Sequence, residues 1–324
     1  MPARDPVHAA GDVRALEDPA DRALLELLQR LEALEYDFVT PTPETHARVL
    51  RRSPGPGRNL RDVLGWSRPF DPETIGPELA DLLRRGGALH DIGGLLTSCV
   101  RVSRLAGRLY LHSAYPTEAP DSVFLGPDSY RFAAFLQREI EPGAERLSIL
   151  DVGAGAGVGA LVAADLCPGA RLTLSDVNAK ALRLARINLA HAGADARYAR
   201  TSGLDGLHGP FDVVVANPPY MGAVTGRTYR DGGEMHGAQL SLNWATAAME
   251  RLSPGGRVML YTGSAIVFGK DRLKTGLARA AHAAGFAMSY DEIDPDVFGE
   301  TLSEPGYEDV ERIAAVGCVL TRHA

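Results

Sequence analysis

The spacing of apolar residues changes near residue 120 and divides the chain into two parts of different character. Before this point, apolar residues recur at helical spacing in short segments, the first at residues 24–34 with Asp21 as its expected N-cap. Thr40-Pro41-Thr42-Pro43-Glu44 predicts the start of a second helix, because threonine suits the N-cap and proline the first helical turn. Residues 75–83 predict a third helix that ends at Gly86-Gly87.

Two strands are expected after these helices. Residues 96–102 and 108–112 have strand-like patterns and are joined at Ala106-Gly107. Helices followed by a hairpin resemble a winged-helix module, an arrangement that serves protein docking as often as DNA binding. Residues 1–20 are rich in proline, alanine and aspartate without periodicity, so we expect a flexible tail there.

From residue 123 onward, strand and helix patterns alternate, which is typical of a parallel sheet with helical crossovers. A turn is expected at Ser253-Pro254-Gly255-Gly256. The expected helices are residues 157–166, 179–192, 238–252 and 270–284. The expected strands are residues 146–150, 171–175, 196–201, 211–216, 257–262, 286–293 and 312–321.

The predicted strand at residues 211–216 ends abruptly. Val213-Val214-Val215 is a run typical of a parallel strand that is buried on both faces. Pro218 and Pro219 stop the strand, because proline has no backbone N–H and a fixed φ. Asn217 therefore lies at the carboxyl end of a strand, where open α/β sheets bind their ligands.

Composition limits the class of protein. The chain has 324 residues, of which 45% are apolar, enough for two domains, or for one large domain with an extension, with substantial cores. It opens with no signal-peptide pattern and has no stretch near 18 uncharged apolar residues, so we expect neither secretion nor a membrane span. Cys99, Cys167 and Cys318 are isolated and odd in number, which supports neither a disulfide framework nor a zinc site. We expect no metal and a reducing, cytoplasmic location.

The formal net charge of -7 argues weakly against indiscriminate binding to polyanions. One segment, residues 48–68, is nevertheless strongly basic and contains only one acidic residue, Asp62. It forms either a solvated basic face or a docking surface for nucleic acid or an acidic partner. Its basic residues are Arg48, Arg51, Arg52, Arg58, Arg61 and Arg68.

A glycine-rich loop and an acidic residue indicate a nucleotide-like ligand. Asp151-Val152-Gly153-Ala154-Gly155-Ala156-Gly157 follows a strand and opens a helix, so its backbone can approach such a ligand closely. A tight strand-to-helix turn would explain the same glycines. Asp176 ends the next strand, where a carboxylate can accept from a ribose, although it could instead cap the helix that begins near Ala179. The pair suits both an NAD-dependent dehydrogenase and an S-adenosylmethionine (SAM) methyltransferase.

The order of the glycine loop, Asp176 and Asn217-Pro218-Pro219-Tyr220 (NPPY) resembles the class I SAM-dependent methyltransferases that methylate planar nitrogen. In that family, NPPY serves adenine N6, guanine N2 and the glutamine side-chain amide, the last in release-factor glutamine methyltransferases. The resemblance covers residues 120–324 and implies an α/β fold, a Rossmann-like sheet of seven strands with an antiparallel last pair. From this resemblance together with the residue pattern before it, we expect a flexible tail at 1–20, a substrate-recognition domain of helices and a hairpin at 21–118 and a catalytic methyltransferase domain at 119–324.

The resemblance also implies the roles of the site residues. Asn217, Pro218, Pro219 and Tyr220 would be catalytic: the Asn217 side-chain oxygen and the Pro218 carbonyl accept N–H bonds from the methyl acceptor, and Tyr220 stacks on it. Residues 123–130 resemble the segment that covers the methionine end of SAM, and Leu204 is the expected contact of the adenine ring. A place in the core would explain Phe124 and Tyr130 equally well. The implied cofactor-binding residues are Phe124, Tyr130, Asp151, Gly153, Ala154, Gly155, Gly157, Asp176, Val177, Ser202, Gly203, Leu204 and Asn217.

Two further segments are candidates for substrate contact. Residues 229–237 resemble the glycine-rich loop after NPPY in release-factor glutamine methyltransferases, although the Glu-Pro step of that family is absent. They form either a lid over the substrate or an ordinary surface loop. The acidic residues 294–300 lie between the last two strands, where they would suit a basic protein partner better than a phosphate backbone.

We therefore expect a SAM-dependent N-methyltransferase whose favoured acceptor is a protein glutamine side-chain amide. An RNA or DNA base, methylated at adenine N6 or guanine N2, is the alternative, supported by the arginine-rich segment and the hairpin. An NAD-dependent oxidoreductase would leave NPPY unexplained, and a non-catalytic binding module would not require the intact motifs. The expected partner is a macromolecule, either a release-factor-like or ribosomal protein or a nucleic acid, and not a membrane; a monomer is favoured.

Overall fold

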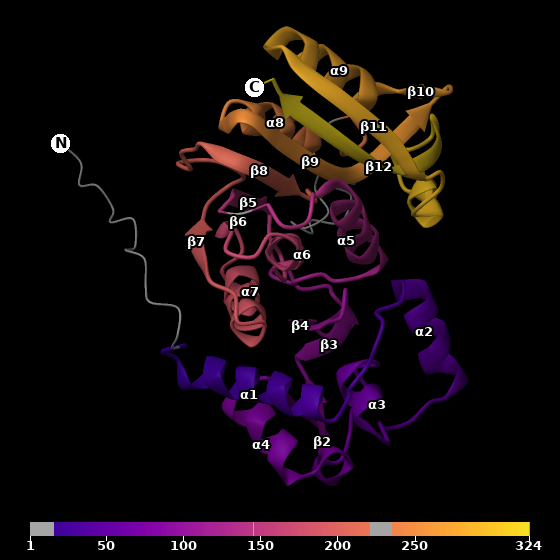
Figure 1. The fold of residues 1–324 in the computed structure, drawn as a ribbon. Coiled ribbons are helices and arrows are strands. Elements are labelled where there is room, and N and C mark those ends of the chain that lie inside the picture. Colours follow the sequence, from indigo (N-terminus) through magenta and orange to yellow (C-terminus); the bar gives the residue numbers. More distant parts are fainter. Residues whose placement is uncertain (1–15, 145, 221–234, 324) are drawn as a thin grey trace, which may run out of the picture.

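The structure, a computed structural model, describes residues 16–144, 146–220 and 235–323. Its N-terminal part consists of short helices followed by two hairpins (Figure 1). The helices are α1 (Pro19–Ala33), α2 (Pro43–Arg52), α3 (Leu60–Leu64), the 3-10 helix η1 (Pro72–Ile75) and α4 (Pro77–Arg85). The hairpins pair β1 (Leu89–Ile92) with β2 (Leu95–Ser98), and β3 (Val100–Leu105) with β4 (Arg108–Ser113).

The N-cap of α1 differs from the prediction. Asp18 caps the helix by accepting a hydrogen bond from the Ala20 N–H at 2.8 Å. Asp21 lies inside the first turn, where its carboxylate accepts from Arg183 Nε at 2.6 Å. The predicted cap at Asp21 is therefore wrong, because a long-range ion pair uses that carboxylate. Thr42 caps α2 as the prediction for the second helix requires.

The strand predicted at residues 96–102 is divided between two hairpins. Ser98 ends β2, and its hydroxyl both donates to the Val100 carbonyl at 2.8 Å and accepts from the Val100 N–H at 3.2 Å. These local bonds redirect the chain, so β3 starts at Val100 and pairs with β4 instead. The turn predicted at Ala106-Gly107 is confirmed, since Leu105 pairs with Arg108 across it.

The second part of the chain forms a mostly parallel sheet with the strand order β11-β12-β9-β8-β5-β6-β7. β12 runs antiparallel to its two neighbours, and a short strand, β10 (Lys270–Asp271), pairs in the antiparallel sense with the end of β9. The predicted fold class is confirmed. The strands are β5 (Ser148–Val152), β6 (Arg171–Asp176), β7 (Ala196–Arg200), β8 (Phe211–Ala216), β9 (Leu252–Val267), β11 (Phe286–Asp294) and β12 (Val310–Arg322).

The turn predicted at residues 253–256 is a bulge inside β9 rather than a break before a strand. Leu252 pairs with Phe211 while Arg257 pairs with Val213, so the residues between Leu252 and Arg257 lie opposite the single residue Asp212 of β8. The predicted strand at 257–262 is part of this longer strand. Gly255 has a φ of 74°, which lets the chain turn there without steric strain.

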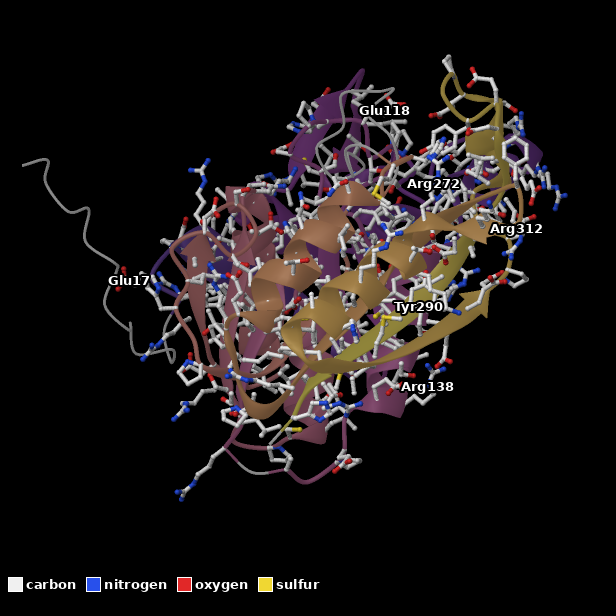
Figure 2. All side chains as sticks on the ribbon, turned by 90° about the horizontal axis from the view of Figure 1, so that it is seen from above. Glu17, Glu118, Arg138, Arg272, Tyr290 and Arg312 are labelled. Carbon is white, nitrogen blue, oxygen red and sulfur yellow. The ribbon has the colours of Figure 1, made fainter. Side chains whose placement is uncertain are left out.

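Helices cover both faces of the sheet (Figure 1). One face carries α5 (Pro127–Glu139), α6 (Val158–Leu166) and α7 (Ala179–His191), and the other carries α8 (Gln239–Met249) and α9 (Arg272–Ala284). Figure 2 shows Arg272 at the start of α9 and Tyr290 on β11 below it. Asp271 joins these elements, because its carboxylate caps α9 at Lys274 N and accepts from the Tyr290 hydroxyl at 2.6 Å.

The N-terminal part packs against α7 through a buried asparagine. The Asn188 side chain accepts from the Leu111 N–H at 2.8 Å and donates to the Leu111 carbonyl at 3.0 Å, so it pairs with the backbone of β4. The same amide nitrogen donates to the Ala156 carbonyl in the glycine loop at 2.9 Å. Asn188 thus joins the second hairpin, α7 and the glycine loop, and these bonds satisfy a fully buried amide.

Candidate functional site

A cavity of about 850 Å³ opens at the carboxyl ends of β5, β6 and β8. These strands are neighbours in the sheet, so the segments that follow them meet at one edge. Most residues predicted for the site line this cavity: Phe124, Asp151, Gly153, Ala154, Gly155, Asp176, Val177, Ser202, Gly203, Asn217, Pro218, Pro219 and Tyr220.

The glycine loop between β5 and α6 is held by hydrogen bonds within the protein. The Gly153 and Ala154 N–H groups donate to the Ser175 carbonyl at 2.8 and 3.0 Å. The Gly155 N–H donates to Asp176 Oδ2 at 3.0 Å, and the Gly157 N–H donates to the Ala154 carbonyl at 2.7 Å. With these four donors occupied, the loop presents few N–H groups to a ligand, unlike a loop that surrounds a pyrophosphate.

Asp176 stabilises the glycine loop and faces the cavity at the same time. In addition to the bond from Gly155, its Oδ1 accepts from the Asn178 N–H at 2.8 Å. The N-cap of α7 is Asn178, whose side chain accepts from the Lys180 N–H. This rules out the alternative that Asp176 caps the helix, and it leaves the remaining lone pairs of the carboxylate for a ligand. Burial raises the pKa of Asp176, and the backbone hydrogen bonds oppose that rise.

Asp151 lies underneath the loop, where its Oδ2 accepts from the Ala160 N–H in α6 at 2.8 Å. Burial raises its pKa to about 7; the Ala160 hydrogen bond opposes this shift and the charge of Asp176 adds to it. The unfolded chain binds this proton only below a pH of about 4. Between pH 4 and pH 7 the folded state therefore binds more protons than the unfolded state. The stability that the protonated Asp151 carboxyl contributes is complete below pH 4 and is lost as the pH rises to 7.

Asp151→Asn is expected to make the stability of the protein less sensitive to pH. At pH 5 the wild-type carboxyl is neutral and similar in shape to the amide, whereas at pH 8 it carries a buried charge that the variant lacks. The free energy of unfolding of the variant, relative to wild type, should rise by about 3 kcal/mol from pH 5 to pH 8. Denaturant titrations measure this difference, with the exposed Asp205→Asn as control. Parallel pH profiles for wild type and Asp151→Asn would contradict the assignment.

The NPPY hook, Asn217-Pro218-Pro219-Tyr220, forms the wall of the cavity after β8. No described residue makes a hydrogen bond to the Asn217 side chain, so its amide is available to a ligand. The Tyr220 ring packs so closely on Gly263 that a Cβ there would lie 2.3 Å from Cδ2 of the ring. Its centroid is 5.8 Å from that of Phe298, and its hydroxyl lies beside the Asp128 carboxylate. The ring is therefore held on several sides, and its stacking on the methyl acceptor stays a prediction.

Trp244 in α8 is a cavity residue that the sequence pattern did not identify. Gly153 and Gly203 both have positive φ and lie against its ring. A Cβ at Gly153 would lie 2.8 Å from Trp244 Cη2, and one at Gly203 would lie 2.6 Å from Nε1. Trp244 therefore requires glycine at both positions. The expected helix at 238–252 contained Trp244, but its pattern does not reveal which loops the ring meets.

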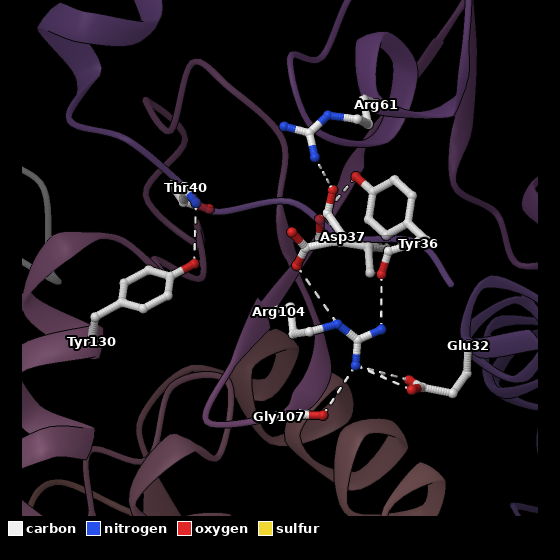
Figure 3. Close-up of polar contacts among 9 residues, drawn as sticks. Glu32, Tyr36, Asp37, Thr40, Arg61, Arg104, Gly107 and Tyr130 are labelled. Atoms are coloured by element: carbon white, nitrogen blue, oxygen red, sulfur yellow. Dashed lines mark hydrogen bonds and ion pairs between the residues drawn. The ribbon is translucent and has the colours of Figure 1, made fainter. Parts of the chain in front are cut away.

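Three residues predicted to bind the cofactor do not line the cavity. Gly157 is the left-handed N-cap of α6 and packs on Leu189, which explains the glycine structurally. Leu204 is 4% exposed and belongs to the hydrophobic core, so its side chain does not reach the cavity, whereas the other two residues predicted in this segment, Ser202 and Gly203, line it. Tyr130 points toward the N-terminal part, where its hydroxyl accepts from the Thr40 N–H at 3.1 Å (Figure 3).

The arginine-rich segment is less basic than its sequence indicates. Arg48 pairs with Glu44, Arg61 donates to the Asp37 carbonyl (Figure 3), and Arg68 is buried with bonds to Ser53 and Gly55 carbonyls. The remaining arginines are exposed, and no described side chain pairs with theirs: Arg51, Arg52 and Arg58.

The structure describes one of the two predicted substrate segments in full and the other only in part. Residues 229–234 of the expected lid lie outside the described residues, while His236 bonds to Asp309 at 3.0 Å. In the acidic segment 294–300, Asp294 forms an ion pair with Arg131 at 2.8 Å, and Phe298 lines the cavity. Acidic groups in this segment are thus partly neutralised from within the protein.

Two kinds of feature are absent from the described part of the chain. No helix there is long and apolar enough to cross a bilayer. Within the same residues, no three His, Cys, Asp or Glu side chains are grouped so that they could hold a metal ion.

Comparison with known proteins identifies similar sequences and folds. A family model described as the methyltransferase small domain matches residues 132–266. A release factor glutamine methyltransferase of Deinococcus radiodurans is 33% identical over 288 residues, which cover 85% of this chain and 95% of the relative. A ribosomal RNA small subunit methyltransferase C of Serratia proteamaculans is 43% identical over 72 residues, 22% of this chain and 21% of the relative. The solved structure of a SAM-dependent methyltransferase from Agrobacterium tumefaciens is 18% identical, covers 72% of each chain and has a TM-score of 0.47.

Proposed function

The chain belongs to the SAM-dependent methyltransferases with a methyltransferase small domain, and on this premise we propose that it methylates a planar nitrogen, namely a glutamine side-chain amide of a protein. This family membership excludes the alternative of an NAD-dependent oxidoreductase, which the glycine loop and Asp176 alone had left open. The choice of methyl acceptor depends on the residues around the cavity and on the part of the chain before residue 119.

SAM fits the residues that line the cavity. The volume of about 850 Å³ is within the range of small-molecule sites. Among the described residues, the lining carries four carboxylates but only Lys180 and Arg200 as cations, which suits a ligand with sulfonium and ammonium charges. The glycine loop, whose N–H groups are largely bonded within the protein, suits a ligand without phosphate. The carboxylates are Asp121, Asp128, Asp151 and Asp176.

The hook residues account for the activation of the acceptor. When bound, SAM supplies an electrophilic methyl group. The nitrogen of an amide is a poor nucleophile because its lone pair is delocalised. The Asn217 side-chain oxygen and the Pro218 carbonyl can each accept an N–H of the acceptor, which keeps electron density on nitrogen and orients it. The rigid prolines hold these two acceptors in place, so catalysis consists mainly of positioning and electrostatics.

One observation supports the preference for a protein glutamine as the methyl acceptor. The similarity to the relative named a release factor glutamine methyltransferase covers 95% of that protein and extends into the part of this chain before residue 119. The similarity to the ribosomal RNA methyltransferase covers only 72 residues. We accordingly propose that residues 21–118 recognise the substrate. An RNA base remains the second candidate because Arg51, Arg52 and Arg58 are exposed in this part.

Labelled methyl transfer separates the two acceptors. With tritiated SAM and either cell lysate or a purified release factor, we expect label in protease-sensitive, nuclease-resistant material. Raising the salt from 50 to 200 mM should then change the apparent affinity for the acceptor little, whereas an enzyme with 6–10 phosphate contacts would lose roughly 10³–10⁵-fold. Nuclease-sensitive label with a steep salt dependence would replace the glutamine by a nucleic-acid base.

A further inference from the structure

The hydroxyl of Tyr220 lies beside a carboxylate in the wall of the cavity. This carboxylate is Asp128, in the first turn of α5, which is 4% exposed. The Tyr261 hydroxyl from β9 donates to the same carboxylate at 3.0 Å. Two tyrosine hydroxyls from different elements therefore meet at one carboxylate, at the start of a helix, where the helix dipole favours a negative charge.

Neighbouring groups hold Asp128 in turn. Arg131, one turn further along α5, lies 3.6 Å from Asp128 and also forms the ion pair with Asp294 at 2.8 Å. Asp294 ends β11, and Phe298 in the segment after this strand packs against the Tyr220 ring. The hook is thus connected to α5, β9 and the end of β11 through one carboxylate and one arginine.

We propose that Asp128 is a positioning residue that fixes the Tyr220 ring and so sets the shape of the slot for the methyl acceptor. Because Tyr220 directly follows the rigid prolines, fixing its hydroxyl at one end and its backbone at the other leaves the ring one orientation. Asp128 belongs to the segment of residues 123–130, so this contact joins that segment to the hook. The inference rests on the proposed function for its catalytic consequence, whereas the orientation of the ring is independent of the reaction.

Fluorine NMR of protein labelled with 3-fluorotyrosine tests the orientation without any acceptor. Tyr220→Phe identifies the Tyr220 resonance among the ten tyrosines. In Asp128→Ala we expect this resonance to shift and to average between ring orientations, whereas Asp128→Asn, which keeps an acceptor oxygen, should preserve most of the wild-type signal. The matched control is Asp271→Asn, which alters another tyrosine–aspartate pair, with Tyr290, outside the cavity lining. An unchanged Tyr220 resonance in Asp128→Ala would overturn the proposal.

Binding and turnover separate a positioning role from direct contact with the cofactor. We expect Tyr220→Phe to bind SAM within about threefold of wild type by calorimetry. With the acceptor that labelled transfer identifies, Asp128→Ala and Tyr220→Phe should each reduce kcat/KM by about 10–100-fold, the worth of one hydrogen bond to a charged group. The double variant should lose no more than the worse single one, because both act through one contact. Multiplying losses, or a large loss of SAM affinity in Tyr220→Phe, would reject the positioning role. Absence of transfer by wild type with an intact NMR response would reject the proposed function instead.

Discussion

Asn217→Ala is expected to reduce methyl transfer by at least 10²–10³-fold while SAM affinity changes little. The expected size reflects the loss of one preorganised hydrogen-bond acceptor in a site where charge develops during the reaction. The Asn217 side chain has no hydrogen bond to any described residue, so its removal breaks no bond within the described part of the fold. The loss should therefore appear in kcat rather than in stability.

Single-turnover transfer to the acceptor and calorimetry with SAM measure the two effects separately. Asn243→Ala is a suitable control, because Asn243 is an exposed asparagine in α8 whose side chain bonds only to Gln239 among the described residues. Turnover of Asn217→Ala equal to that of this control would exclude the hook mechanism. A loss of SAM binding in Asn217→Ala, without a loss of folding, would move Asn217 from the acceptor to the cofactor.

Asp176→Ala should have the largest effect on SAM affinity, about 100-fold or more. The substitution removes the acceptor of the Gly155 and Asn178 N–H groups, and each such bond to a charged group contributes about 1.5–3 kcal/mol. It also removes the proposed ribose contact. Burial raises the pKa of this carboxyl, so removing it also relieves a desolvation cost, and the loss of stability should be smaller than the loss of affinity.

Calorimetric titration with SAM tests this prediction, with thermal unfolding measured alongside. Asp205→Ala is the matched control, because Asp205 is an exposed aspartate in the segment after β7. Asp176→Asn retains one acceptor oxygen, so its SAM affinity should lie between that of the control and that of Asp176→Ala. If Asp176→Ala binds SAM within threefold of wild type, the cofactor site is not at the carboxyl end of β6.

The parts of the site that come directly after strands could be predicted from the sequence because one rule locates them. A buried apolar run identifies a strand, and its carboxyl end faces the ligand in an open α/β sheet, which gives the glycine loop, Asp176 and Asn217 together. Leu204 illustrates the limit of this rule. Leu204 directly follows Gly203, which lines the cavity, yet its own side chain points into the core. A shift of one residue along the chain therefore decides whether a residue faces the cavity or the core.

Residues that reach the site from elsewhere in the chain could not be predicted in this way. Trp244 lies on a helix that the sequence predicts, whereas Asp128 lies on α5, which the sequence analysis does not predict, and in neither case does the pattern show which loops face the residue. The N-terminal part shows the same limit, since α3 has five residues and β1 four, too short for a periodic signal. Asp18 and Asp21 are both good caps by type, and only the tertiary position of Arg183 decides between them.

Asn188 affects how this chain can change over evolutionary time. The amide recognises the second hairpin through the N–H and carbonyl of Leu111, groups that nearly every amino acid possesses. These two bonds would therefore survive a change of residue 111 to any type except proline. The side chains of the hairpin are less free, because most residues of β3 and β4 are buried in the core. Change over time is thus limited by Asn188 at this backbone contact and by packing along both strands.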